Sequence, residues 1–408
     1  MRHCFILLLM LCVDVTGAHA QVWSLHRSYP EMEFSDVKFL NNDEGFVVGD
    51  SALNGIFITT VIFKTVDGGQ SWASYNLGNP NQRITKSYFL NSSEGFAAGR
   101  NGGGNNGLFL KTIDGGMTWT NQTNFNEKLF NVCFLDSLQG WVMGKNGLLS
   151  KTVDGGVNWT AVNLTNEDIH SMRFFNSQQG VMACGGGEIY ITSNGGMNWS
   201  SISSNVVEDL MSIEVYNSSA WICGTAGTLL FSSDTAQSWT SQTAAINIDF
   251  NDISFGDSLH GWTGGLAGLM NQTIDGGGLW QNQQSNSAFE ITGISIPSAD
   301  QGWFCTANGE LYAFGGVTNI LETNIQKRYI SAYPNPATNV VYIPLHQSSS
   351  EVNRINIYNL QGNLSLVIQD PETIRTGSIS LQELLPGMYF LEVISGVEIA
   401  YSKFIKSN

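Results

Sequence analysis

The hydrophobic and polar positions of this chain repeat with a period of about 40 residues. Each repeat contains four short apolar or alternating runs, separated by turns rich in glycine and asparagine. In the third repeat the runs are "LFNVCFL", "GWVMG", "LLSKTV" and "NWTAVNL". Runs of this kind predict β-strands, and four strands in about 40 residues are typical of one blade of a β-propeller. We name the predicted strands A, the innermost, to D, the outermost.

Two signatures alternate along the repeats. The first is a stretch such as "KTVDGGQSW", whose final tryptophan recurs at steps of 47, 40, 40, 40 and 41 residues. The second is a glycine–aromatic pair or a variant of it, at 45–46, 95–96, 140–141, 180–181, 220–221, 261–262 and 302–303. The second signature occurs seven times and the first six times, and Trp23 in "VWSLHRS" supplies the missing tryptophan. The chain therefore contains seven predicted repeats.

The last repeat, "ITGISIPSADQGWFCTANGELYAFG", has strands A, B and C but no strand D. We predict that the segment around Trp23 supplies this outer strand, so that the two ends of the repeat region pair. Such closure removes the unpaired edges that an open sheet exposes. The predicted fold is all-β, a seven-bladed β-propeller closed by an N-terminal outer strand and followed by a small C-terminal β-sandwich.

The stretch "KTVDGGQSW" has the chemistry of a tight turn. Asp67 can accept hydrogen bonds from its own turn, Gly68 and Gly69 can adopt positive φ, and Trp72 can bury its ring at the start of strand D. We interpret the motif as a structural turn between strands C and D. Its equivalent residues are Asp67, Asp114, Asp154, Asn194, Asp234 and Asp275, with Trp72, Trp119, Trp159, Trp199, Trp239 and Trp280.

This pattern resembles the Asp-box, or BNR, repeat of sialidases, sortilin-type receptors and several glycoside hydrolases. The first two copies match it fully, whereas later copies depart from it with Asn158, Asn194, Leu279 and the glycine-free "SSDTAQSW". Together with the preceding "F-x-x-x-x-x-G-W-x-x-G", the repeats are similar to the propeller of photosystem II assembly factors over nearly all of residues 21–317. The resemblance implies the fold. It does not imply a photosystem, because such propellers occur in many secreted proteins.

The first 20 residues have the features of a secretory signal peptide. Arg2 precedes an apolar run from Phe5 to Val13, and Ala18-His19-Ala20 fits the A-x-A cleavage pattern. We predict removal of residues 1–20. A membrane anchor is the alternative, but the apolar run is shorter than the roughly 20 residues that span a bilayer. Lipidation of Cys12 is disfavoured because Leu11 is bulky.

After a predicted linker at 318–329, alternating apolar runs over 330–408 predict a small β-sandwich. The elements "YPNP", "NLQG", "LPGMY" and "KFIK" resemble the type A sorting domain of the type IX (Por) secretion system of Bacteroidetes. The resemblance implies export to the periplasm and then across the outer membrane, with residues 330–408 as the part that the type IX machinery recognises. It also implies a secreted or outer-membrane surface location. A carbohydrate-binding or adhesion sandwich is the alternative.

The charge and cysteine content of the chain indicate which kinds of ligand it is expected to bind. Removing the signal leaves 17 basic and 33 acidic residues, a net charge of −16, and residues 21–317 hold 11 and 26 of them. This negative field disfavours nucleic acid. Cys133, Cys184, Cys223 and Cys305 form no C-x-x-C pair and no His/Cys cluster with zinc spacing, so we expect unpaired thiols, no cofactor and no metal. A divalent cation on the acidic residues described next is the alternative.

A charged residue stands six positions before the apolar anchor of every predicted strand A. The seven are Glu33, Arg83, Lys128, Asp168, Asp209, Asp249 and Glu290. At the mouth of a central channel they would form a ring with one basic sector, flanked by longer B–C loops in the first two repeats, "DSALNGIFITTV" and "RNGGGNNG". We hypothesise that Arg83, Lys128 and Arg100 bind an anionic or polar group there, with Glu33, Asp249 and Glu290 as further ligand-binding candidates. The alternative is that these charges only solvate the strand entries, and that the loops are tolerated insertions.

These features favour a secreted or surface binding scaffold, without catalysis, whose extracellular ligand is a glycan or a protein. The alternative is a surface glycoside hydrolase, which needs two carboxylates at a defined separation, with Asp168 and Asp209 as the candidates. A sialidase is disfavoured, because residues 21–317 contain only four arginines and no R-I-P-like segment.

Overall fold

The computed structural model describes residues 22–53, 56–78, 82–102, 106–315, 328–329, 332–343, 352–359, 364–368, 370, 376–395 and 398–407. The predicted signal peptide and residues 318–327 of the predicted linker lie outside them. The chain divides into two compact parts, Met1–Thr318 and Asn319–Asn408, which we describe separately. No helix in the described ranges is long and apolar enough to cross a membrane.

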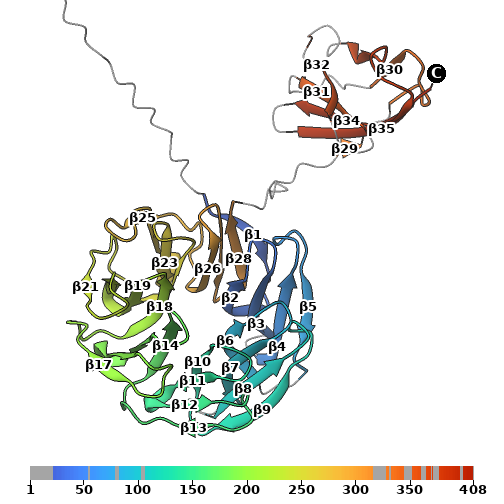
Figure 1. The fold of residues 1–408 in the computed structure, drawn as a ribbon. Helices are drawn as coiled ribbons and strands as arrows, with labels where there is room; N and C mark the ends of the chain where they lie inside the picture. The colour runs from blue at the N-terminus through green and yellow to red at the C-terminus, as the bar shows by residue number, and fades with distance from the viewer. Residues whose placement is uncertain are drawn as a thin grey trace, which may run out of the picture. The chain divides into compact units, whose positions relative to one another are not determined.

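The described residues of the N-terminal part form seven four-stranded antiparallel sheets, arranged around a central axis (Figure 1). The all-β fold class predicted from the sequence is confirmed. We number the sheets in chain order. Sheets 1 to 3 are β2 (Met32–Phe39), β3 (Gly45–Leu53), β4 (Ile56–Thr65), β5 (Ala73–Asn76); β6 (Gln82–Phe89), β7 (Gly95–Asn101), β8 (Gly107–Thr112), β9 (Thr120–Phe125); and β10 (Leu129–Phe134), β11 (Gly140–Gly144), β12 (Leu149–Thr152), β13 (Thr160–Ala161).

The other four sheets follow the same order from the inside outward, except that β1 is the outer strand of sheet 7. Sheets 4 to 7 are β14 (Ile169–Phe174), β15 (Gly180–Cys184), β16 (Ile189–Thr192), β17 (Ser200–Ile202); β18 (Leu210–Tyr216), β19 (Ser219–Gly224), β20 (Leu229–Ser232), β21 (Thr240–Ser241); β22 (Phe250–Phe255), β23 (Gly261–Gly265), β24 (Met270–Thr273), β25 (Gln281–Gln283); and β26 (Ile291–Ser298), β27 (Gln301–Thr306), β28 (Glu310–Phe314), β1 (Ser24–Ser28).

The N-terminal strand β1 holds the two ends of the repeat region together. It pairs antiparallel with β28, from Ser24 opposite Ala313 to Ser28 opposite Glu310. The preceding Trp23 is fully buried, and its ring contacts Trp262, Phe304 and Phe314 edge-on. On the other side, the Trp72 indole N–H of sheet 1 donates to His26 Nε2 at 3.4 Å, so β1 bonds to both the last sheet and the first.

Aromatic rings pack between most neighbouring sheets. At five of the seven contacts the ring of the glycine–aromatic pair lies on a phenylalanine near the end of the next sheet's innermost strand. Between sheets 4 and 5 the contact is aliphatic, with Val181 and Val215 in one core, and between sheets 6 and 7 Trp262 packs on Phe314 of β28. Phe46 stacks on Phe89 with ring centroids 3.7 Å apart, and Trp221 stacks on Phe255 at 3.9 Å. Trp303 of sheet 7 stacks on Phe39 of sheet 1, with ring centroids 4.8 Å apart and an angle of 8° between the ring planes. The last sheet therefore contacts the first in the same way as most sheets that follow each other along the chain. The aromatic residues that recur at regular spacing in the sequence therefore make contacts between sheets.

Each Asp-box forms a closed set of hydrogen bonds. In the first box Thr65 Oγ1 donates to Asp67 Oδ1 at 2.7 Å, and the Ser71 N–H donates to the same oxygen at 2.9 Å. The hydrogen bonds from Ser71 hold the pKa of Asp67 below its ordinary value. Gly69 has φ 87°, and a Cβ there would collide with Trp303, so both conformation and space require glycine. The box thus positions a turn against the aromatic contact.

The C-terminal part contains a five-stranded sheet of order β29-β35-β34-β31-β32 and a two-stranded sheet of β30 and β33. Its core includes Val341, Ile379, Leu391 and Phe404, drawn from both sheets. The strands are β29 (Arg328–Tyr329), β30 (Val340–Tyr342), β31 (Val352–Tyr358), β32 (Leu364–Ile368), β33 (Ser378–Ser380), β34 (Gly387–Ser395) and β35 (Glu398–Lys406).

The contact between His26 and Trp72 predicts an acid-sensitive ring closure. Burial lowers the pKa of His26 from 6.5 to about 4, and the neutral ring accepts the Trp72 hydrogen bond. Because the folded pKa is depressed, this contribution to stability is complete above pH 6.5 and is lost as the pH falls towards 4 and below. We expect the urea midpoint of the wild type to fall more between pH 7 and pH 4 than that of a His26→Gln variant. Equal falls in the two proteins would contradict this assignment.

Candidate functional site

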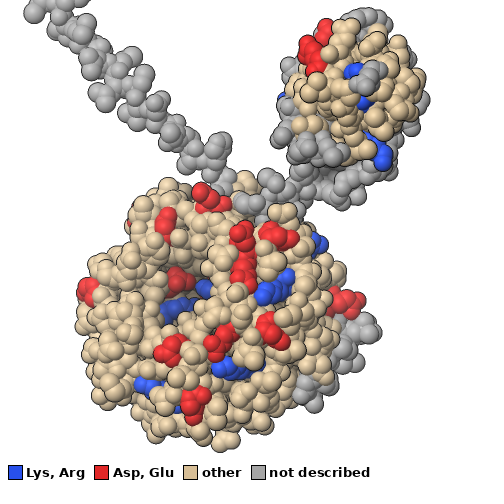
Figure 2. Space-filling model, turned by 45° about the vertical axis from the view of Figure 1, so that its right-hand side comes forward, with Lys and Arg blue, Asp and Glu red and all other residues tan. Residues whose placement is uncertain are grey.

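A cavity of about 610 Å³ opens at the centre of the ring, where the innermost strands begin. Figure 2 shows this face hollowed, with acidic and basic side chains around the hollow. All seven sheets contribute to its wall, so it is the mouth of the central channel. The lining residues are Glu33, Phe34, Ser35, Asp50, Thr85, Lys86, Lys128, Phe130, Asn131, His170, Met211, Ser212, Asn251, Glu290, Thr292 and Ala307.

Three of the predicted ligand-binding residues line this cavity, namely Glu33, Lys128 and Glu290. Arg83 and Arg100 do not line it; they are cross-strand partners on β6 and β7. Asp249 also lies outside the lining. Arg83 Nε lies 3.6 Å from Asp50 Oδ2, and Asp50 is a lining residue that the sequence analysis did not single out.

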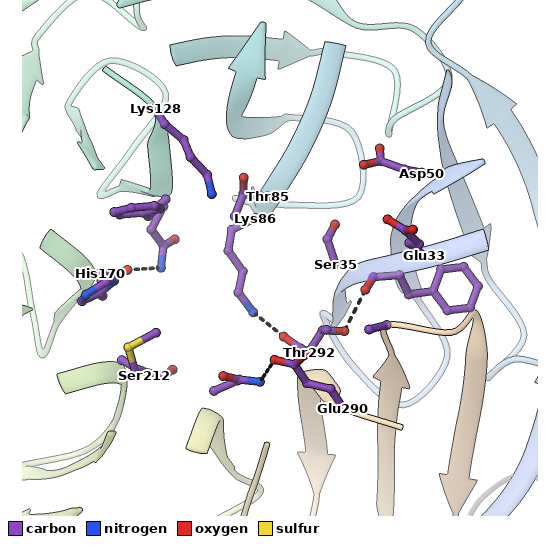
Figure 3. Close-up of a pocket in the computed structure, with 16 residues that line it drawn as sticks. Glu33, Ser35, Asp50, Thr85, Lys86, Lys128, His170, Ser212, Glu290 and Thr292 are labelled. Carbon is purple, nitrogen blue, oxygen red and sulfur yellow. Dashed lines mark hydrogen bonds between the residues drawn. The ribbon is translucent and has the colours of Figure 1, made fainter. Parts of the chain in front are cut away.

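Lys128 carries the basic side of the cavity. Its ammonium nitrogen lies 5.0 Å from the centroid of the Phe130 ring, which stacks in turn on His170 at 5.2 Å. In Figure 3 the ammonium group points into the cavity, across from Glu33 and Asp50. Burial and the neighbouring charge of Arg100 lower the pKa of Lys128. A partly desolvated ammonium group held over an aromatic ring is suited to receive an anionic or polar group.

The opposite side of the cavity is acidic. Asp50 is only 8% exposed and accepts a hydrogen bond from Thr60 Oγ1 at 2.6 Å. Burial raises its pKa to about 6, although Thr60 and Arg83 favour the ionised form. Glu290 Oε1 accepts a hydrogen bond from Asn251 Nδ2 at 2.8 Å, which fixes that carboxylate at the rim. The cavity therefore has one cationic and one anionic wall.

The acidic residues at the entries of sheets 4, 5 and 6 have a structural role in the fold. Asp168, Asp209 and Asp249 each accept a hydrogen bond from a backbone N–H in the preceding sheet's turn between its second and third strands. The donors, Asn146, Gly186 and Ala226, have positive φ at the apex of 3₁₀ turns, at Lys145–Gly147 (η1), Gly185–Gly187 (η2) and Thr225–Gly227 (η3). A fourth such turn is Leu266–Gly268 (η4).

This bonding bears on the two candidate catalytic carboxylates. Asp168 Oδ1 accepts from Asn146 at 2.8 Å and Asp209 Oδ1 accepts from Gly186 at 2.9 Å. Neither residue lines the cavity. Both hydrogen bonds link neighbouring sheets. This structural role explains the presence of a carboxylate at each position without a substrate.

The floor of the cavity is an ion-pair cluster that the sequence analysis missed. Lys86 Nζ lies 3.1 Å from Asp36 Oδ1 and 3.2 Å from Asp252 Oδ2, and donates to the Thr292 carbonyl at 3.4 Å. Burial lowers the pKa of Lys86, but Asp252 and Asp36 outweigh it and the net shift is upward. Lys86 in turn contributes to a lowered pKa of Asp252, against the effect of burial. The available signal was a polar residue three positions after the entry charge in six of the seven repeats, the seventh having Gly293 there.

A smaller cavity of about 70 Å³ lies beyond this cluster and is lined by Lys38, Tyr88, Arg173 and Glu214 among others. Lys86 lines both cavities, whereas Asp36 and Asp252 line the smaller one, so the cluster stands between the two and obstructs the channel. In the described part of the chain, no group of three or more His, Cys, Asp or Glu residues could hold a metal ion. The four cysteines Cys133, Cys184, Cys223 and Cys305 are buried and unpaired.

Comparison with protein families finds two matches. Residues 89–220 match the family described as photosynthesis system II assembly factor YCF48, and residues 331–407 match the secretion system C-terminal sorting domain. Both resemblances inferred from the sequence motifs are confirmed. No curated protein matches the chain.

Solved structures with the same fold include YCF48 bound to a D1 peptide, at 20% identity and a TM-score of 0.58, covering 72% of this chain and 97% of that one. YCF48 from Cyanidioschyzon merolae is 18% identical, with a TM-score of 0.56 and coverage of 72% and 98%. The WD40 propeller domain of Doa1 is 9% identical, with a TM-score of 0.56 and coverage of 73% and 98%. These likenesses show that the N-terminal part has a β-propeller fold.

The floor cluster predicts a specific pattern of stability. In Lys86→Met, two carboxylates remain inside the channel without their cation, and we expect a loss of about 3–5 kcal/mol in the free energy of unfolding at pH 7. The triple variant Asp36→Asn/Lys86→Met/Asp252→Asn removes the whole set of charges and should recover at least half of that loss. Chemical denaturation measures both. A single variant that loses under about 1 kcal/mol, or a triple variant no more stable than the single one, would contradict the assignment.

Proposed function

We propose that this chain is an exported, non-catalytic binding scaffold. The seven sheets are the blades of a closed propeller, completed by β1, and the channel mouth is the binding site. Residues 330–408 form a β-sandwich that the type IX secretion machinery recognises. A signal peptide at 1–20 begins the export, and the protein acts outside the cell or on its surface.

The sorting-domain match over 331–407 supports export, because it covers nearly the whole C-terminal part. The described strands are consistent with a two-layer sandwich, since the core draws apolar side chains from both the five-stranded and the two-stranded sheet. Cys133, Cys184, Cys223 and Cys305 fit this proposal as buried side chains that need no disulfide partner.

The position of Lys128 is the observation that carries the binding proposal. None of the ion pairs within the described residues includes Lys128, although its ammonium group points into a cavity with acidic side chains on the opposite wall. A related propeller is known with a bound peptide. By analogy, we propose that this cavity receives a polypeptide segment, with an acidic side chain of the partner at Lys128 and hydrogen-bonding groups against Asn251 and Glu290.

A charge-reversal experiment tests this proposal. We expect Lys128→Glu to weaken binding of a fluorescein-labelled Glu/Ser peptide by at least about tenfold, or 1.4 kcal/mol. Lys403→Glu is the matched control, because it makes the same charge change on an exposed lysine of the C-terminal part. Arg83 is left intact, since its replacement would disturb Asp50.

Three outcomes would contradict the proposal: no binding of the acidic peptide, equal weakening by both variants, or release of reducing ends from a glycan that is lost in Asp168→Asn. The last result would establish the glycoside hydrolase alternative. Binding on a glycan array without product release, in place of peptide binding, would keep a scaffold but exclude a polypeptide ligand.

A further inference from the structure

The face of the propeller opposite the cavity mouth is built from two sets of turns. The Asp-boxes join the third and fourth strands, and the turns between the first and second strands lie beside them. Backbone hydrogen bonds link the two sets within a sheet, from Gly68 to Asp43, from Gly155 to Leu138 and from Gly276 to Leu259. We call this surface the box face. It comprises 41–44, 66–71, 91–94, 113–118, 136–139, 153–158, 176–179, 193–198, 217–218, 233–238, 256–260, 274–279 and 299–300.

The box face is strongly acidic. Its turns contain eleven carboxylates and no lysine or arginine. Four basic side chains from elsewhere bond to it, Arg27, Lys64, Lys111 and Lys151, which leaves seven carboxylates in excess. Hydrogen bonds from Ser238 lower the pKa of Asp234 to about 2, so the box carboxylates keep their charge in mild acid. The eleven are Asp43, Glu44, Asp67, Glu94, Asp114, Asp136, Asp154, Asp234, Asp257, Asp275 and Asp300.

The same turns expose apolar side chains that the box does not use. The box hydrogen bonds involve the threonine or serine, the aspartate and backbone N–H groups, whereas the residues between them project into solvent. Ile113 is 75% exposed and Met197 is 70% exposed. Exposed apolar groups gathered on one face indicate an interaction surface. The exposed apolar residues here are Val66, Ile113, Met117, Leu138, Val153, Val157, Met197, Leu259, Ile274 and Leu279.

A groove of about 680 Å³ runs into this face between sheets 3 and 4. Val153 and Met197 line it with the deeper Leu135 and Phe174, while Asp136 lies at its edge. Lys151 also lines it, but its ammonium group donates to the Gly195 carbonyl at 3.1 Å and lies 5.1 Å from the centroid of the Trp141 ring. The groove is therefore a slot lined by apolar and uncharged polar side chains, with the carboxylates Asp136 and Asp154 in the turns of sheet 3 on one side of it.

We infer that the box face is a second interaction surface, which docks a basic polypeptide segment carrying apolar side chains. The apolar side chains enter the slot between Val153 and Met197, and lysine or arginine side chains of the partner lie over the surrounding carboxylates. Charge complementarity selects this occupant, because nucleic acids and anionic lipid surfaces would be repelled by the excess of carboxylates. The inference does not depend on the ligand of the channel mouth.

The test uses the full mature chain and fluorescein-labelled peptides of equal length. A Lys/Leu peptide supplies both charge and apolar groups, a Lys/Ser peptide supplies charge alone, and a Glu/Leu peptide supplies apolar groups with the wrong charge. We expect the Lys/Leu peptide to bind at least tenfold more tightly than the Lys/Ser peptide. Val153→Ser/Met197→Ser should weaken binding of the Lys/Leu peptide at least tenfold, and this binding should decrease with added salt. The same variant should leave unchanged any binding of the Glu/Leu peptide, which the site proposed at the channel mouth can receive.

Val207→Ser is the control, because Val207 is 80% exposed but lies outside the box face. It should leave the affinity unchanged. Equal binding of the Lys/Leu and Lys/Ser peptides would show non-specific attraction to an acidic protein and overturn the inference. Equal weakening by the Val207 and groove variants would also overturn it. A melting temperature equal to that of the wild type would show that Val153→Ser/Met197→Ser is folded.

Discussion

The packing of apolar side chains between neighbouring sheets, with aromatic rings at most of these contacts, is the interaction on which this molecule depends. Sheets of four strands expose two apolar faces, and neither face is stable in water unless another sheet covers it. The rings set the spacing between sheets and bring the innermost strands together around one axis. The contact between Trp303 and Phe39 repeats this geometry between the last sheet and the first, and the pairing of β1 with β28 secures it.

Bringing seven strands to one axis creates the electrostatic problem that the channel residues solve. Strands that converge leave polar groups facing each other, and these groups must be paired or hydrated. At the floor, one lysine between two carboxylates satisfies the requirement and obstructs the channel. At the entries of sheets 4 to 6, carboxylates satisfy backbone N–H groups of the preceding turns. Lys128 remains with its ammonium group directed into the mouth, which is why it is the residue on which the binding proposal rests.

The two ends of the propeller therefore present different chemistry. The mouth combines a cation, an aromatic pair and carboxylates around one cavity, which suits a small part of a ligand held in a defined orientation. The box face spreads carboxylates and exposed apolar groups over several sheets, which suits a longer segment held along a surface. One repeat produces both, because its loops alternate between the two ends of the sheets.

The sequence alone determined the all-β class, the two repeated signatures and the family resemblance of each part, because these depend on local spacing. In each box the aspartate or asparagine accepts a hydrogen bond from the backbone N–H four residues later, and that separation can be read from the sequence. The spacing of the entry charges also located the channel mouth, since Glu33, Lys128 and Glu290 line the cavity. The outer strands were predicted too long in sheet 3, where β13 spans only Thr160–Ala161, because an outermost strand has a partner on one side only.

Only the tertiary structure distinguished among residues that occupy the same place in the repeat. Asp168 and Lys128 are equivalent in sequence, yet one accepts a neighbouring backbone N–H and the other points into a cavity. The Asp36, Lys86 and Asp252 cluster joins sheets 1, 2 and 6, which are adjacent across the channel but separated by up to 216 positions along the chain. The periodicity of the sequence shows which position in a repeat a residue occupies. Which residue of another sheet it contacts depends on how the seven sheets pack around one axis, and no local sequence pattern shows that.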